Sequence, residues 1–272
     1  MFKIYGGGKT QIVNQNRFPD GTLALDIQKV YEDSAMITWL YESDAEMFTL
    51  MCIVDILRRD GWCKYLELEM PYLNSARMDR IKSNNENFSL KVFAKWLNSL
   101  KFDKVITYNV HSNVSEALIE NIQNILPEED IKTCIEKYNP DVIFFPDEGA
   151  CKRYSDMKII KDCNLPIAFG IKKRDWKTGK IESLEVIGGE HVQGKRVLII
   201  DDIVSMGGTP FFSGKKLKEL GAKDIALYIT HCENTIEKGN LLLDDSPISK
   251  IYTTDSICTI THNKIEFVKK FR

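Results

Sequence analysis

Several features are absent from the 272-residue sequence, and each absence excludes a class of protein. No apolar run approaches the roughly 20 residues that a membrane-spanning helix needs. The sequence begins Met-Phe-Lys-Ile-Tyr-Gly, without the apolar stretch of a secretory signal peptide, so we expect neither a membrane protein nor a secreted one. The 37 basic and 39 acidic residues nearly balance, and a net charge of −2 argues against a general nucleic-acid-binding protein.

Cysteine is present but unpatterned. The seven cysteines are odd in number, lie far apart and form no Cys-x-x-Cys pair, so the sequence supports no zinc site. Reduced, mostly buried thiols and a cytoplasmic location are therefore expected. A hydrophobic content of 43% and a charged content of 28% are typical of a globular protein, and the length fits one large or two ordinary domains.

One stretch in the second half of the chain carries the strongest local signal. The apolar, mostly β-branched residues 197–200 predict a buried strand, and the adjacent carboxylates of Asp201 and Asp202 follow it directly. A short Gly-containing loop comes next. We predict that Thr209 caps a helix in which Pro210 takes the first position and which Gly221 ends.

This arrangement predicts an anion site beside a diol site. Backbone N–H groups of the loop can converge on a phosphate at the helix N-terminus, and glycine permits a close approach. Asp201 and Asp202 can accept hydrogen bonds from ribose hydroxyls or hold Mg²⁺ beside them. An ordinary turn with solvated acids is the plainer interpretation, but the complete pattern makes it the weaker one. The loop residues are Ser205, Met206, Gly207, Gly208 and Thr209.

Along the rest of the chain, strand and helix patterns alternate. Expected strands cover residues 35–40, 65–70, 104–110, 141–145, 166–171, 224–231 and 250–254. Expected helices cover residues 44–59, 89–100 and 114–126, a segment ending at 138, and a short segment near 234–243. Residues 175–195 are polar with weak periodicity, so a mobile loop is expected in part of this segment. Gly6 to Thr10 predicts a glycine-rich turn, since the spacing of a P-loop is not met. The alternation predicts an α/β fold with mainly parallel sheets flanked by helices.

The composition also predicts two domains. Pro127 and the three acidic residues after it form the clearest boundary, which gives an N-terminal domain of residues 1–127 and a C-terminal domain of residues 128–257. The tail 258–272 is considered as a possible part of the N-terminal domain. Similar strand–loop–helix units in both halves favour two related domains.

Chemically useful side chains follow three further strands. His111 follows strand 104–110, Asp147 follows strand 141–145, and Lys172 to Arg174 follow strand 166–171. Ligands of open α/β sheets bind at the carboxyl ends of the strands, so these positions are candidates for a site. Taken singly, a lone histidine and a solvated run of charges are the plainer interpretations.

Six segments together resemble, in order, segments of the PRPP synthetase family, which forms phosphoribosyl pyrophosphate (PRPP) on a type I phosphoribosyltransferase fold. They are Arg17-Phe18-Pro19-Asp20-Gly21, Pro71-Tyr72 through Ala76-Arg77 to Asp79-Arg80, Asn109-Val110-His111, Pro146-Asp147, Lys172-Lys173-Arg174 and the stretch from Asp201 to Thr209. Each segment alone is weak evidence, whereas six in register are strong evidence. The resemblance extends from Arg17 to about Thr254.

The resemblance implies two tandem phosphoribosyltransferase-like domains and a diphosphokinase. The anomeric hydroxyl of a ribose 5-phosphate group would attack the β-phosphorus of Mg²⁺-ATP, giving a 1-diphosphate and AMP. By resemblance, the catalytic residues are Lys172, Arg174 and Arg77; the ATP-binding residues are Phe18, Asp20, Arg77, Met78, Asp79 and His111; the metal ligands are His111 and Asp147; and Asp201, Asp202 and the loop from Ser205 to Thr209 bind the ribose phosphate. In the family, a neighbouring subunit supplies the loop matched by Phe18 and Asp20, which implies a homo-oligomer.

Departures from the family pattern affect the choice of acceptor, the molecule that receives the diphosphate group. The first helix of the N-terminal domain and the terminal helix are missing from the pattern, and Thr22, Met78 and Asn109 replace a Glu, a Gln and an Asp. In the phosphate loop, Met206 replaces a threonine whose hydroxyl would donate a hydrogen bond to a terminal 5′-phosphate. The loss of one such bond to a charged group weakens binding by roughly 1.5–3 kcal/mol. ADP-ribose, whose 5′ group is a less charged diester, is therefore an alternative acceptor to ribose 5-phosphate, and would give ADP-ribose 1-pyrophosphate for NAD resynthesis.

Two further functions compete with a diphosphokinase. A phosphoribosyltransferase that consumes PRPP would share the Asp201–Asp202 element, but the segments around Arg77 and His111 speak against it. A non-catalytic family member that regulates a partner protein would not need Lys172 and Arg174.

Overall fold

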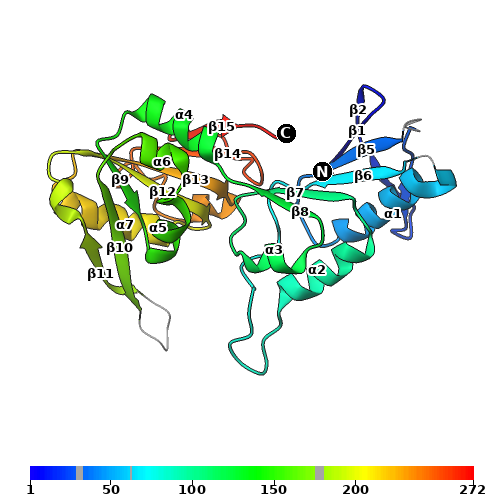
Figure 1. Cartoon of the computed structure of the whole chain (residues 1–272), viewed down its shortest axis with the longest axis horizontal. Helices are drawn as coiled ribbons and strands as arrows, with labels where there is room; N and C mark the ends of the chain where they lie inside the picture. The colour runs from blue at the N-terminus through cyan, green and yellow to red at the C-terminus, as the bar shows by residue number, and fades with distance from the viewer. Residues whose placement is uncertain (29–32, 62, 175–180) are drawn as a thin grey trace. The chain divides into compact units, whose positions relative to one another are not determined.

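The structure, a computed structural model, describes residues 1–28, 33–61, 63–174 and 181–272, without the side chains of residues 60, 172–174 and 181–183. Two compact units make up the chain, Met1–Leu126 and Pro127–Arg272 (Figure 1). The division lies one residue before the boundary expected from composition. Each unit is described separately below.

The first unit contains a six-stranded sheet, a two-stranded sheet and three α-helices in its described part. Its elements are β1 (Phe2–Gly6), β2 (Lys9–Ile12), β3 (Gln15–Arg17), β4 (Leu23–Leu25), β5 (Ser34–Trp39), α1 (Glu46–Arg58), the 3₁₀ helix η1 (Arg59–Gly61), β6 (Tyr65–Glu69), α2 (Ser89–Ser99), β7 (Lys104–Tyr108), α3 (Val114–Leu118) and β8 (Ile122–Ile125). The larger sheet has the order β2-β1-β5-β6-β7-β8. Strands β5 to β8 are parallel, whereas β1 is antiparallel to both β2 and β5.

One face of this sheet carries the core of the first unit. Trp39 at the end of β5 is fully buried, and its ring stacks on Phe2 at a centroid distance of 5.7 Å. Helices α2 and α3 lie on the same side of β7 and β8 in Figure 1. Helices α1 and α2 each bury residues spaced three and four positions apart, as an amphipathic helix requires. These residues are Leu50, Ile53 and Leu57 in α1, and Leu90, Phe93 and Leu97 in α2.

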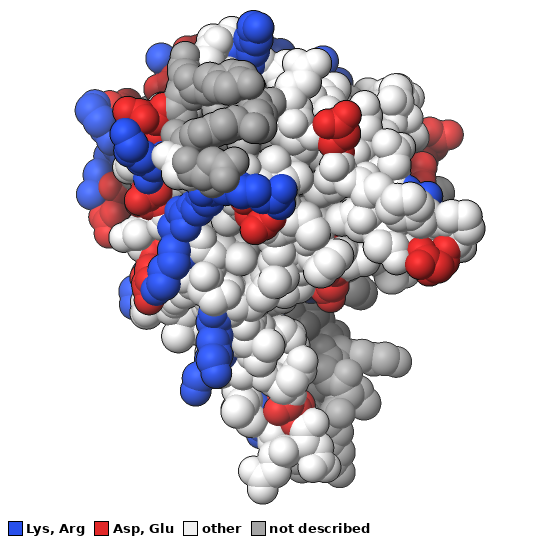
Figure 2. Space-filling model, turned by 90° about the vertical axis from the view of Figure 1, so that its right-hand side faces the viewer, with Lys and Arg blue, Asp and Glu red and all other residues white. Residues whose placement is uncertain are grey.

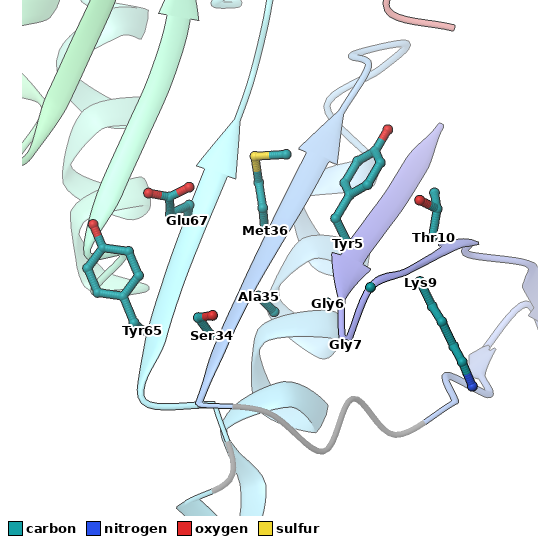
Figure 3. Close-up of a pocket in the computed structure, with 11 residues that line it drawn as sticks. Tyr5, Gly6, Gly7, Lys9, Thr10, Ser34, Ala35, Met36, Tyr65 and Glu67 are labelled. Atoms are coloured by element: carbon teal, nitrogen blue, oxygen red, sulfur yellow. The ribbon is translucent and has the colours of Figure 1, made fainter.

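The opposite face holds a shallow pocket of about 480 Å³. Tyr5, Met36 and Glu67 are direct neighbours across β1, β5 and β6, and their half-buried side chains line this pocket (Figure 3). The β1–β2 turn closes one side, and its Gly7 and Gly8 have φ of +61° and +65°, which glycine adopts without strain. The glycine-rich turn predicted at this point is therefore confirmed, as an antiparallel hairpin turn.

The second unit contains one seven-stranded sheet with helices on both faces. Its elements are α4 (Glu128–Tyr138), β9 (Val142–Phe145), α5 (Glu148–Tyr154), α6 (Lys158–Asp162), β10 (Ile167–Arg174), β11 (Ile181–Ile187), the 3₁₀ helix η2 (Gly189–His191), β12 (Arg196–Val204), α7 (Gly208–Glu219), β13 (Asp224–Cys232), the 3₁₀ helix η3 (Asn234–Lys238), β14 (Lys250–Thr254) and β15 (Ile265–Lys269). The strand order is β11-β10-β9-β12-β13-β14-β15, and among the described strand pairs only β10–β11 is antiparallel.

Strand β12 runs through the centre of this sheet and is buried on both faces. Its residues Val197 to Ile200 are all 0% exposed. Side chains of α4, α5 and α6 pack on one face, and side chains of α7 and of the segment after β13 pack on the other. Burial on both faces explains the continuous apolar run in the sequence. The predicted α/β class with mainly parallel sheets is confirmed.

One sequence-based expectation for a helix is wrong. The helix expected over residues 114–126 stops at Leu118, because Ile119 is extended and Asn121 has a left-handed φ of +56°, and the chain then enters β8. Within residues 175–195, in part of which a loop is expected, β11 pairs with β10 and so has a partner that local periodicity does not show. Residues 175–180 of that expected loop lie outside the described part of the chain.

The tail 258–272 belongs to the second unit, so its possible assignment to the first is corrected. Strand β15 pairs in parallel with β14 at the edge of the second sheet. Glu266 of β15 forms ion pairs with Lys137 of α4 and with Lys250 of β14, the latter at 3.1 Å. Beyond β15, the backbone N–H groups of Phe271 and Arg272 donate to the carboxylate of Asp255.

The surface shows no large charged field on the face drawn in Figure 2. Basic and acidic side chains are scattered there, and most of the surface between them is uncharged. None of the described helices is long and apolar enough to cross a membrane.

The ion pairs of Glu266 lead to a pH-dependent stability prediction. The hydrogen bond from Lys137 and then the one from Lys250 lower the pKa of Glu266 below 4.5. A pKa lowered by folding adds stability above the unfolded value, and this contribution is lost as the pH falls through the folded value. Glu266→Gln should therefore lower the free energy of unfolding at pH 7 by about 0.5–1 kcal/mol, as expected for partly exposed pairs.

The measurement is urea unfolding at several pH values. The difference between Glu266→Gln and the wild type should shrink as the pH falls below 4.5. Substitution of the exposed Glu237 by Gln is the control and should have no such effect. A difference that is the same at pH 7 and pH 3 would contradict this account of the tail.

Candidate functional site

The carboxyl end of β12 carries the two adjacent acids, and the structure treats them differently. Asp202 is 5% exposed, and its Oδ2 lies 2.9 Å from Nη1 of Arg153 in α5. Asp201 is half-buried, and its Oδ1 accepts the backbone N–H of Asp202 at 2.9 Å. Asp201 is therefore the more accessible of the two carboxylates.

The phosphate loop, Ser205 to Thr209, leads from β12 into α7. The helix begins at Gly208 with Gly207 as its N-cap, so the expected cap at Thr209 is wrong by two residues. The reason is the conformation of Gly207, whose φ of +83° makes the turn that starts the helix earlier than the Thr-Pro pair suggests. The loop lies at the N-terminus of a twelve-residue helix, where unpaired N–H groups and the helix dipole favour an anion.

The segment after β13 packs directly against the back of the phosphate loop. A Cβ atom added to Gly239 would lie 1.8 Å from the carbonyl oxygen of Met206, and one added to Gly207 would lie 2.3 Å from Leu241. The loop therefore has no room to move backwards. The side chain of Met206 is 54% exposed.

Asp147 lies at the carboxyl end of the neighbouring strand, β9. It is the N-cap of α5, and its Oδ1 accepts the backbone N–H of Ala150 at 2.9 Å. Arg153 lies near the other end of the same short helix and reaches Asp202. Sequence reasoning missed Arg153, although an arginine six residues after an aspartate at a strand end can be seen in the sequence.

Lys172 and Arg174 belong to the end of β10. Phe169 pairs with Phe145, the last residue of β9, so β10 extends past the end of β9 at which Asp147 lies. The side chains of Lys172 and Arg174 are outside the described part, and their predicted catalytic role stays a prediction.

In the first unit, the structure brings Asp79 to the end of β7, beside His111. Ser112 donates to Oδ2 of Asp79 at 2.6 Å, and Arg80 donates to both carboxylate oxygens at 2.6 and 2.9 Å. These hydrogen bonds, that of Arg80 above all, hold the pKa of Asp79 at about 2, with a smaller contribution from the charge of His111. Asp79 is thus ionised at neutral pH, and it ties the loop after β6 to the end of β7.

The other predicted ATP-binding residues are exposed. Arg77 and His111 lie on the surface, and Met78 is 38% exposed. Phe18 and Asp20 form the tip of the β3–β4 hairpin, where Asp20 accepts the backbone N–H of Thr22 at 2.9 Å and Phe18 is 59% exposed. An aromatic ring exposed at a hairpin tip is available for a ligand or a second subunit.

The donor chemistry of the described residues fits a magnesium ion carried by a substrate. No group of three or more His, Cys, Asp or Glu side chains that could hold a metal occurs in the described ranges. Mg²⁺ commonly takes one or two carboxylates and completes its shell with phosphate oxygens and water. The Asp147 carboxylate is an oxygen donor of this kind, at a strand end next to the one that carries Asp201.

Comparisons with known proteins agree with this arrangement. A family model described as the phosphoribosyl transferase domain matches residues 115–258. The ribose-phosphate pyrophosphokinase of Pyrococcus furiosus is 28% identical over 262 residues, which cover 91% of each chain. Ribose-phosphate pyrophosphokinase 2 of Archaeoglobus fulgidus is 27% identical over 245 residues, covering 89% of this chain and 83% of the relative.

A solved structure shares the fold over almost the whole chain. The crystal structure of phosphoribosylpyrophosphate synthetase from Mycobacterium smegmatis matches with a TM-score of 0.78 at 18% identity. The match covers 95% of this chain and 86% of that one.

The contact behind the phosphate loop gives a stability prediction. Gly239→Ala should lower the free energy of unfolding by about 1–3 kcal/mol, because the new methyl group overlaps the backbone of Met206 and the loop must shift. Urea unfolding followed by circular dichroism measures the change. Substitution of the adjacent, exposed Lys238 by Ala is the matched control. Equal stability of Gly239→Ala and the wild type would show that the loop is not held from behind.

Proposed function

Because the chain belongs to the phosphoribosyl transferase domain family and, as its motifs predicted, to the PRPP synthetases within it, we propose that it is a magnesium-dependent ribose-phosphate diphosphokinase. It transfers the β,γ-diphosphate of ATP to the anomeric hydroxyl of a ribose 5-phosphate group and releases AMP. The observation that carries this proposal is the phosphate loop at the N-terminus of α7, directly after Asp201 and Asp202.

The second unit supplies the acceptor site of the proposed enzyme. The 5′-phosphate binds the backbone N–H groups of the phosphate loop, where the exposed Gly208 leaves the backbone accessible. The ribose hydroxyls donate to the carboxylate of Asp201. These contacts hold the anomeric hydroxyl in place, and positioning supplies a large part of the rate enhancement in phosphoryl transfer.

In this proposal the first unit supplies the donor site. Arg77, Met78, Asp79 and His111 bind ATP at the carboxyl end of β7 and the loop that Asp79 ties to it. Phe18 and Asp20 contact the adenine of ATP bound by a neighbouring subunit, so the active enzyme is a homo-oligomer. Exposure of Phe18 at the β3–β4 tip supports this assignment.

Charge is the main barrier to the reaction. The anomeric oxygen forms a bond to the β-phosphorus, the bond from that phosphorus to the oxygen bridging it to the α-phosphate breaks, AMP leaves, and the hydroxyl proton passes to solvent. Lys172, Arg174 and Arg77 neutralise the charge that develops on the transferred group. His111 and Asp147 would hold Mg²⁺, which when bound neutralises charge on the phosphate oxygens.

A second acceptor, ADP-ribose, is favoured by one observation. Met206 occupies the place of a hydroxyl donor, and its side chain is 54% exposed at the mouth of the phosphate loop. A thioether cannot donate to a terminal phosphate, but it can pack against the extended part of a larger acceptor. The product would be ADP-ribose 1-pyrophosphate, an intermediate suited to NAD resynthesis. A cytoplasmic location stays a prediction from the cysteine pattern.

The proposed reaction predicts AMP release from Mg²⁺-ATP only in the presence of an acceptor. Ribose 5-phosphate and ADP-ribose should be compared side by side, with the products identified by mass spectrometry. Removal of Mg²⁺ by EDTA should abolish the release, because ATP then lacks its charge-neutralising ion. Absence of AMP with both acceptors would exclude the proposed enzyme. A phosphoribosyltransferase would instead consume PRPP, and an inactive regulator would bind a partner protein stably.

Met206→Thr tests whether this residue selects the acceptor. Restoring the hydroxyl should shift the ratio of kcat/KM values toward ribose 5-phosphate by roughly tenfold or more, since a hydrogen bond to a charged group contributes about 1.5–3 kcal/mol. Steady-state kinetics with both acceptors measure the ratio. Met51→Thr, at a 43% exposed methionine of α1, is the control. An unchanged ratio in Met206→Thr would remove the argument for ADP-ribose.

A further inference from the structure

The ion pair between Arg153 and Asp202 indicates a role for Arg153 at the acceptor site, and this inference rests on the proposed function. None of the sequence motifs assigned a role to Arg153. Its Nη1 lies 2.9 Å from Oδ2 of Asp202, and the two side chains are only 22% and 7% exposed. A carboxylate this deeply buried needs a charged partner, because removal of that partner leaves an uncompensated charge away from water.

The pair separates the roles of the two adjacent acids. Asp202 is buried and paired with Arg153 of α5, whereas Asp201 is half-buried and accepts the backbone N–H of Asp202. Successive side chains of a strand point to opposite faces, so the two carboxylates extend to opposite faces of the sheet, and Asp202 is the one that reaches α5. The acid that accepts the ribose hydroxyls is therefore Asp201.

Helix α5 connects this pair to the next strand end. Asp147 caps its first turn and accepts the backbone N–H of Ala150, and Arg153 lies in its last turn. Strands β9 and β12 are parallel neighbours, so their carboxyl ends lie side by side. A single short helix thus fixes the end of β12 relative to the end of β9.

We propose that Arg153 is a positioning residue for the acceptor: it holds Asp202, and through Asp202 it fixes the end of β12, so that Asp201 and the phosphate loop face the ribose phosphate. Arg153 itself does not touch the acceptor. Its loss should therefore weaken acceptor binding through the same step as the loss of Asp202.

A double-mutant cycle tests this role. Arg153→Met, Asp202→Asn and the double variant are compared for ribose 5-phosphate binding by calorimetry and for KM and kcat, and thermal melting followed by circular dichroism checks folding. Each single variant should weaken ribose 5-phosphate binding at least tenfold, with the KM for ATP changed less than twofold. The double variant should bind no more weakly than the weaker single variant, because both substitutions break one interaction.

Two further variants sharpen the test. Lys152→Met removes the neighbouring exposed cation of α5 and should bind ribose 5-phosphate like the wild type. Arg153→Lys keeps the charge and should restore part of the affinity. If Arg153→Met does not fold, Arg153→Lys with and without Asp202→Asn completes the cycle.

Three outcomes would overturn the inference. They are losses that multiply in the double variant, wild-type affinity in Arg153→Met, and a change in the KM for ATP as large as that for the acceptor. Failure of the proposed function would be seen separately, as wild-type protein that binds neither ribose 5-phosphate nor ADP-ribose and releases no AMP. That result would overturn the inference as well.

Discussion

The close approach of Gly239 to the backbone of Met206 is the constraint on which the second unit depends. An anion site built from N–H groups works only if the groups already point at the ligand before it binds. Gly207 supplies the left-handed turn at which α7 starts, and Gly239 and Leu241 fill the space behind the loop, so the loop cannot relax toward them. A side chain at either glycine would collide with backbone or with a buried leucine. The site is thus built by packing as much as by its polar groups.

Carboxylates at the strand ends have structural duties as well as functional ones. Asp202 is paired with Arg153, Asp147 caps α5, and Asp79 accepts hydrogen bonds from Ser112 and Arg80. The Asp202–Arg153 and Asp79–Ser112 bonds each connect two elements that are separate in the sequence. Because a charged hydrogen bond is short and directional, it fixes the geometry of the strand end at which a substrate would bind. Charged residues that motifs identify as ligands therefore also hold the site together.

The first unit has a simpler N-terminal part than the motif pattern of its relatives leads one to expect. Where that pattern has a first helix, the described residues before β5 form the strands β1 to β4. The pocket beside the β1–β2 turn lies near the amino ends of β5 and β6, marked by Ser34 and Tyr65, whereas His111 follows the carboxyl end of β7. Since these strands are parallel, the pocket is at the opposite end of the sheet from the predicted ATP-binding residues and is not part of that site.

The sequence by itself determined the fold class, the family and the central strand–loop–helix element, because these depend on local signals: a doubly buried apolar run, adjacent acids, a Gly-Gly turn and strand–helix alternation. Tertiary structure alone decided the rest. Residues 122–125 are a strand because β7 offers them a partner, and the tail joins the second unit because β14 does the same. Only packing distinguishes Asp201 from Asp202, since the guanidinium that pairs with the buried Asp202 belongs to Arg153, 49 positions away in the sequence. Such pairings arise from contacts between distant parts of the chain, which periodicity and spacing do not encode.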